Sequence, residues 1–123
     1  MAWASLVSAT QNTSITTEQI VLFGGSLHIG LNPGESAHCQ VDVNFPSTPT
    51  DHAIVAVYAS PDGGTTYDLT PLLQFQLDKA TDPNRASFLI SGVHTFRIGV
   101  RRSGSTDTLT SADCRYRLNG ISV

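Results

Sequence analysis

The sequence predicts an all-β protein: an antiparallel two-sheet sandwich of about eight strands, either jelly-roll or immunoglobulin-like. Three segments alternate apolar and polar residues with period two, which is typical of half-buried strands; they span 36–45, 70–78 and 108–118. Clusters of turn-forming residues separate the strand candidates at short intervals, as they do in sandwiches. Helix signals are nearly absent.

The length and composition fit one folded domain. The chain has 123 residues, of which 40% are hydrophobic and 14% are charged. A chain of this size can bury roughly two-thirds of its unfolded surface, which is enough for one core. We therefore expect a single β-sandwich domain over 1–123, with 1–35 as a less regular N-terminal segment that is a possible interface arm.

The N-terminal segment offers weak strand signals. Strands are expected near 3–9 and over 27–31. The stretch SITTEQIVLF, residues 14–23, has room for a turn or two of helix. Ile20 and Val21 favour a strand equally, because β-branched residues pack well on a pleated surface.

The next two strands are clearer. SAHCQVDVNF, residues 36–45, puts its apolar side chains on one face and its polar ones on the other. HAIVAVYA, residues 52–59, is apolar on both faces, as expected of a central strand. Pro46 and Pro49 predict a loop between them, because proline fixes φ and lacks a backbone donor.

The stretch SPDGGTTYD, residues 60–68, resembles the Asp-box of sialidases and other β-rich proteins. A sialidase would need several boxes, an arginine cluster and a far longer chain, so a structural role is expected. The Asp62 carboxylate should accept backbone hydrogen bonds, Gly63 and Gly64 should supply positive φ, and Tyr67 should close the turn. This hairpin would pair 52–59 with about 67–77. Its residues are Ser60, Asp62, Gly64, Thr66 and Tyr67.

The C-terminal part predicts strands over 86–90, 93–102 and 108–118. The period-two pattern places apolar residues inward in the last two, and His94 among them as a core histidine. SGSTD, residues 103–107, reads as a hairpin that joins them. The predicted inward residues are His94, Phe96, Ile98 and Val100, followed by Ala112, Cys114, Tyr116 and Leu118.

Charges are unevenly divided along the chain. Residues 1–80 hold seven acidic residues and one Lys, a charge of −6, whereas 81–123 hold six Arg and three Asp, a charge of +3. Two interpretations stay open: the halves neutralise each other inside one domain, or acidic and basic surfaces meet between subunits. The net charge of −3 argues against nucleic acid as a partner.

The arginines are the strongest candidates for an interaction site. If 93–102 and 108–118 pair through SGSTD, four arginines share one face of a sheet. Like charges opposite one another on paired strands are destabilising unless groups of opposite charge neutralise them. We interpret this set as a candidate protein–protein interface: Arg97, Arg101, Arg115 and Arg117.

Patterns that would indicate an enzyme are missing from the sequence. His28, His38, His52 and His94 lack the short spacings of familiar metal sites, and no Gly-x-Ser-x-Gly elbow occurs. We therefore expect a non-enzyme with no catalytic residue, no metal and no cofactor.

The cysteines and the N-terminus bear on the compartment. The N-terminal stretch has no basic start, and no apolar run approaches the roughly 18 residues that a membrane helix needs. We expect synthesis in a cytoplasm, no membrane contact, and buried thiols at Cys39 and Cys114. A disulfide after cell lysis remains an alternative.

The segments VYASPDGGTTYDLTPLLQFQLD and SGVHTFRIGVRRSGSTDTLTSADCRYRLNGISV resemble small β-sandwich structural proteins of tailed bacteriophages, of the capsid decoration or cement type. The resemblance covers about 55–123. It implies a virion protein without catalysis that binds the major capsid protein lattice, favoured as a homotrimer. Alternatives are a tail or neck protein of the virion, or a carbohydrate-binding β-sandwich module.

Overall fold

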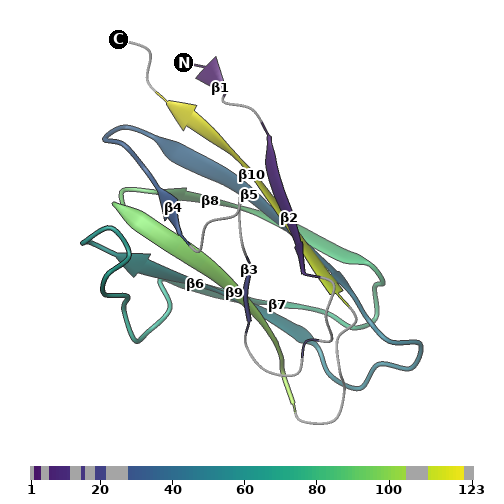
Figure 1. The fold of residues 1–123 in the computed structure, drawn as a ribbon. Coiled ribbons are helices and arrows are strands. Elements are labelled where there is room, and N and C mark those ends of the chain that lie inside the picture. The colour runs from purple at the N-terminus through teal and green to yellow at the C-terminus, as the bar shows by residue number, and fades with distance from the viewer. Residues whose placement is uncertain are drawn as a thin grey trace.

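The computed structural model describes residues 2–3, 6–11, 15, 19–21, 28–104 and 111–120 (Figure 1). Within these ranges every regular element is a strand. One sheet, here called sheet 1, contains β1 (Ala2–Trp3), β2 (Val7–Gln11), β5 (Ser36–Asn44), β8 (Asn84–Ser91) and β10 (Ser111–Gly120). The other, sheet 2, contains β3 (Gln19–Val21), β4 (Ile29–Gly30), β6 (Ala53–Ser60), β7 (Leu73–Leu77) and β9 (Thr95–Arg102).

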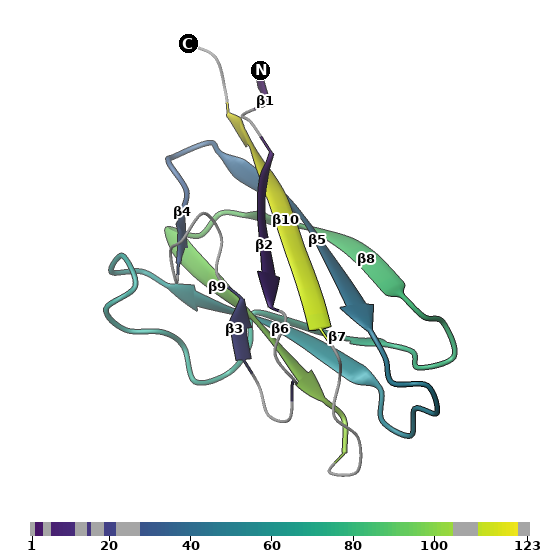
Figure 2. The same cartoon turned by 45° about the vertical axis from the view of Figure 1, so that its right-hand side comes forward.

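The two sheets pack face to face as the layers of a sandwich (Figure 2). In sheet 1, β10 lies between β5 and the short strands β1 and β2, and β8 is the far edge. In sheet 2, β9 lies between β6 and the short strands β3 and β4, and β7 is the far edge. All the pairings between described strands are antiparallel, so the predicted all-β sandwich is confirmed.

The strand order matches a jelly roll rather than an immunoglobulin-like sandwich. β1 and β2 share one edge of β10, and β3 and β4 share one edge of β9, which leaves eight strand positions in two layers. From β5 onward the chain changes sheet at each connection except the one between β6 and β7. That exception is the pairing predicted from the SPDGGTTYD turn, with Ala53 opposite Leu77 and Val57 opposite Leu73.

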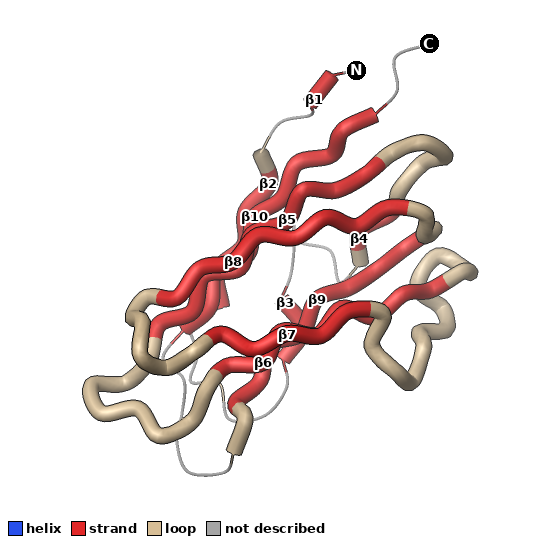
Figure 3. Tube along the Cα trace, turned by 180° about the vertical axis from the view of Figure 1, so that it is seen from behind, coloured by secondary structure: helices blue, strands red, loops and turns tan. Residues whose placement is uncertain are grey.

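The predicted hairpin between 93–102 and 108–118 is wrong. β9 pairs with β6 in sheet 2, whereas β10 pairs with β5 in sheet 1. The two strands are neighbours in sequence but belong to different sheets (Figure 3). Of the predicted SGSTD turn, Ser103 and Gly104 are described, and residues 105–107 lie outside the described ranges.

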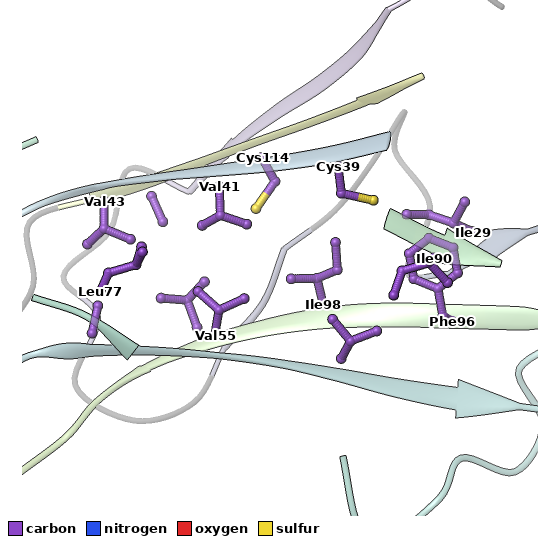
Figure 4. Close-up of a cluster of buried hydrophobic side chains, with 14 of the residues drawn as sticks. Ile29, Cys39, Val41, Val43, Val55, Leu77, Ile90, Phe96, Ile98 and Cys114 are labelled. Carbon is purple, nitrogen blue, oxygen red and sulfur yellow. The ribbon is translucent and has the colours of Figure 1, made fainter. Parts of the chain in front are cut away.

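The core lies between the layers and follows the predicted alternation (Figure 4). β5, β6, β9 and β10 contribute most of its fully buried side chains. Phe75 of β7 meets Phe88 of β8 edge to face, with ring centroids 5.5 Å apart, where the two edge strands approach. The buried members include Cys39, Val41, Val43, Val55, Val57, Phe96, Ile98, Val100, Ala112 and Cys114.

The structure decides one open expectation about local structure and corrects another. Of the segment expected to hold either a helical turn or a strand, residues 19–21 form strand β3, which pairs with β9. His94 is exposed rather than a core residue, because Gly92, with φ 74°, turns the chain and β9 begins one residue later at Thr95.

Candidate functional site

The four predicted interface arginines do not share a face. Arg97 and Arg101 alternate with the buried residues of β9 and so lie on the outer surface of sheet 2. Arg115 and Arg117 alternate with buried residues of β10 and lie on the outer surface of sheet 1. The four predicted arginines are therefore divided equally between the opposite outer faces of the sandwich.

On sheet 1 the arginines border a shallow hollow of about 220 Å³. Gln40 of β5 lies opposite Arg115 and accepts a hydrogen bond from its guanidinium. Arg117 is exposed, and Leu6, 50% exposed, lies just before β2. The hollow is cationic at its rim and partly apolar, and its lining consists of Leu6, His38, Gln40, Arg115, Tyr116 and Arg117.

On sheet 2 one arginine packs against an aromatic ring. The Arg97 guanidinium lies 4.0 Å from the centroid of the Tyr67 ring, and His28 stacks on the same tyrosine with centroids 6.1 Å apart. Burial raises the pKa of the Tyr67 phenol, and the nearby Arg97 charge partly opposes that shift. The Tyr67 Oη and the Arg97 Nε are both buried without a hydrogen-bond partner.

The SPDGGTTYD residues form a hydrogen-bonded turn directly after β6. The Ser60 hydroxyl donates to Asp62 Oδ1 at 2.7 Å, and the same oxygen accepts from the Thr66 N–H at 2.7 Å. Ser60 Oγ also accepts from the Gly64 N–H at 3.0 Å. These bonds lower the pKa of the Asp62 carboxyl, the Ser60 hydroxyl contributing most. Gly63 and Gly64 have φ of 74° and 98°, as predicted.

The connection that follows is longer than the predicted hairpin. β7 begins at Leu73, and residues 61–72, here called the Leu69 loop, separate it from β6. Asp68 N–H donates to Ala59 O at 3.0 Å and Leu72 N–H donates to Val57 O at 2.7 Å, which anchors the loop on both sides of Leu69. Leu69 itself is fully exposed. The sequence pattern assigned residues 70–72 to a strand and missed this side chain, because a single leucine between polar residues carries no periodic signal.

The cysteines are buried free thiols on neighbouring strands. Cys39 of β5 and Cys114 of β10 point into the core (Figure 4). Burial raises the pKa of Cys39 from 9.0 to about 12. The pKa of Cys114 is raised as well, mainly by burial and to a smaller extent by the neighbouring Cys39. Both thiols are therefore protonated and unreactive at neutral pH.

One ion pair joins the acidic and basic halves of the chain. Arg85 of β8 donates to Asp42 Oδ2 of β5 at 2.7 Å, and the Asp42 side chain is almost fully buried. This pair belongs to the first of the two charge interpretations, neutralisation within the domain.

Two kinds of feature bear on metal binding and membrane insertion in the described part of the chain, a cluster of metal-binding side chains and a membrane-spanning helix. No group of three or more His, Cys, Asp or Glu side chains there is placed to hold a metal ion. No helix in the same part is long and apolar enough to span a membrane.

Comparison with known proteins shows a likeness of fold to solved structures. No protein-family model matches this chain, and no curated protein matches it. Among solved structures, a similar chain comes from Bacillus endospore appendages, which are described as a novel family of disulfide-linked pili. The two share 19% identity with a TM-score of 0.55, and the match covers 98% of this chain and 88% of the other. At this identity the likeness establishes a shared fold.

Proposed function

We propose that this chain is a non-catalytic structural subunit of a virion, and most concretely a capsid decoration protein that binds the major capsid protein lattice. The observation that carries the proposal is the placement of arginines on both outer faces of the sandwich. A component of a lattice needs more than one contact surface, and arginine is favoured in protein interfaces.

The exposed leucines support an interface role. Leu6, Leu69, Leu72 and Leu89 are each at least half exposed. Isolated surface leucines are ordinary, but here they lie near the arginine-bearing face of sheet 1 or on the Leu69 loop. The resemblance of about 55–123 to phage decoration proteins adds the virion context.

Binding to a lattice would give the protein its effect through mass action. A protein that binds the assembled shell, and not the dissociated subunits, stabilises the shell by linkage. If three copies were joined as a trimer, avidity would strengthen the contact further. A location in the tail or neck of the virion would use the same surfaces.

The similarity to an appendage subunit favours a second candidate, a building block of a filament. Its fold is shared over nearly the whole chain. The described cysteines differ from what a disulfide-linked filament requires, because both are buried in the core with raised pKa values. In a filament of this chain, Cys39 and Cys114 would therefore not link the subunits, and non-covalent contacts between surfaces would hold them together.

The carbohydrate-binding alternative has less support. Such modules bind sugars on exposed aromatic platforms, yet the exposed large apolar side chains of the described residues are leucines. Tyr67 is covered by Arg97 and His28, and Tyr116 packs against the core.

The test is binding of purified protein to undecorated, expanded phage capsids, followed by a heat challenge of the shell. We expect saturable binding and a higher disruption temperature. The same preparation, concentrated without capsids and viewed by electron microscopy, checks the filament alternative. Filaments that persist in reducing agent would favour that alternative. If the protein neither binds capsids nor forms filaments, a structural role is refuted.

A further inference from the structure

Leu69 is positioned like an interface anchor. Its side chain is fully exposed, but the backbone on each side is hydrogen-bonded to β6, through Asp68 to Ala59 and through Leu72 to Val57. An apolar side chain held out by an anchored loop loses little conformational freedom when a partner covers it.

The hollow on sheet 1 offers a complementary surface. Leu6 gives it an apolar wall, and Arg115 and Arg117 give it a positive rim, with no acidic residue in its lining. Arg115 is held in place by its hydrogen bond to Gln40. The hollow is open and of a size to receive one branched aliphatic side chain.

The charges of the two surfaces are opposite. The Leu69 loop contains two exposed aspartates, Asp62 and Asp68, and no Lys or Arg. The Arg97 guanidinium packed on Tyr67 offsets one of these charges, so the surface keeps a charge of −1. The two arginines of the hollow give +2. Complementary potentials of this kind fix the register of a contact and reject wrong partners.

One molecule cannot fill its own hollow. The Leu69 loop extends from the β6 and β7 end of sheet 2, in the layer opposite sheet 1 (Figures 1 and 3). The hollow is lined by outward-facing residues of β5 and β10 on sheet 1. A contact between them must therefore join two different molecules.

We propose that this chain self-associates heterologously, with the Leu69 loop of one copy docked in the sheet 1 hollow of the next. The occupant of the hollow is thus a second copy of the chain. A heterologous contact closes into a ring or continues as an open filament, depending on the rotation between copies. This inference rests on the proposed structural role and deepens it by naming the surfaces that join the subunits.

Two complementary variants test the proposal. Leu69→Asp replaces the exposed apolar side chain of the loop, here called the knob. The double variant Leu6→Asp/Arg117→Glu removes the apolar wall and one positive charge of the hollow while leaving the Arg115–Gln40 bond in place. Sedimentation velocity over a concentration series should show oligomers for the unaltered protein and at least tenfold weaker association for each variant alone. An equal mixture of the two variants should form one-to-one dimers and nothing larger, because one intact knob and one intact hollow remain.

Gln76→Asp is the control, since Gln76 is exposed on β7 and belongs neither to the Leu69 loop nor to the lining of the hollow. It should associate like the unaltered protein, and equal loss in this variant would overturn the assignment to Leu69. Circular dichroism checks that each variant is folded.

The outcomes separate this inference from the proposed function. Capsid binding by a protein that stays monomeric at high concentration would overturn the inference alone. Variants that assemble normally would do the same. If the unaltered protein shows no self-association and no capsid binding, both the inference and the proposed function are overturned.

Discussion

The Arg97 guanidinium lies 4.0 Å above the ring of Tyr67, and the hydroxyl of that same tyrosine is buried without a hydrogen-bond partner. The ring and the hydroxyl therefore have opposite consequences for stability. A cation over an aromatic face contributes about 0.5–2 kcal/mol. A buried, unpaired hydroxyl costs about 1–3 kcal/mol.

Tyr67→Phe should consequently leave the protein as stable as before or more stable. The variant keeps the ring beneath Arg97 and removes the unpaired hydroxyl. Arg97→Met loses the cation over the ring but also removes the buried, unpaired Nε, so these two effects should largely offset one another in the free energy of unfolding. Urea denaturation of both variants measures the two effects, and a destabilised Tyr67→Phe would contradict the unpaired state of the hydroxyl.

Gly64 should tolerate alanine less well than Gly92 does. Both have positive φ, which costs an alanine about 1–2 kcal/mol. A Cβ at Gly64 would also lie 2.6 Å from His28 Nδ1, whereas nothing lies within 4 Å of one at Gly92. The His28 ring would have to move off Tyr67, so Gly64→Ala should cost about 1 kcal/mol more than Gly92→Ala.

The double variant Gly64→Ala/His28→Ala supplies the control for the clash. Without the His28 imidazole, Gly64→Ala should lower the free energy of unfolding by no more than Gly92→Ala does. Thermal unfolding of the four proteins closes this double-mutant cycle. Equal costs at the two glycines in the presence of His28 would show that the ring moves freely.

The sequence predicted the layers of this protein better than its surfaces. Alternation in 36–45 and 108–118 identified the core faces of β5 and β10, because period two is fixed by strand geometry. The turn at 60–67 was predictable too, since Asp62 and the two glycines act on their own backbone neighbours.

The prediction that the four arginines share one face failed because it depended on the path of the chain between distant strands. A turn-like composition after β9 does not say whether the next strand returns to the same sheet or crosses to the other. In a jelly roll most connections cross, so Arg97 and Arg115 end on opposite sides of the molecule. Leu69 escaped notice because its importance comes from complete exposure on an anchored loop, a tertiary property.

The Asp62 turn should make a pH-dependent contribution to stability. The pKa of Asp62 is lowered below its ordinary value of 3.8, chiefly by the Ser60 hydroxyl and then by the Thr66 N–H. Because the folded-state pKa is depressed, this contribution is present above pH 3.8 and is lost as the pH falls through the lowered folded-state value. The stability difference between the unaltered protein and Asp62→Asn should therefore shrink below pH 3.8.

An NMR titration of the Asp62 carboxyl carbon checks the same prediction directly. Its midpoint should lie below 3.8, and it should move upward in Ser60→Ala, which removes the largest cause of the shift. A midpoint at or above 3.8 for Asp62 would mean that the turn does not hold the carboxylate as described.

Cys39 should be chemically silent in the folded protein. Its pKa is raised from 9.0 to about 12 because the thiol is buried, and the thiolate is the reactive form. At pH 8 a thiol-specific reagent should label neither Cys39 nor Cys114 until denaturant is added, when both should react. The raised pKa also stabilises the fold fully below pH 9.0, and this stabilisation declines as the pH rises toward 12.

Cys39→Val is the matched variant, since valine fills a similar volume and cannot ionise. Its stability should fall less steeply than that of the unaltered protein between pH 9.0 and 12. Assembly of either protein should be indifferent to reducing agent, because thiols locked inside the sandwich cannot bridge subunits. Rapid labelling of Cys39 in the native protein would show that the layers open readily, and sensitivity of assembly to reduction would place a disulfide between subunits after all.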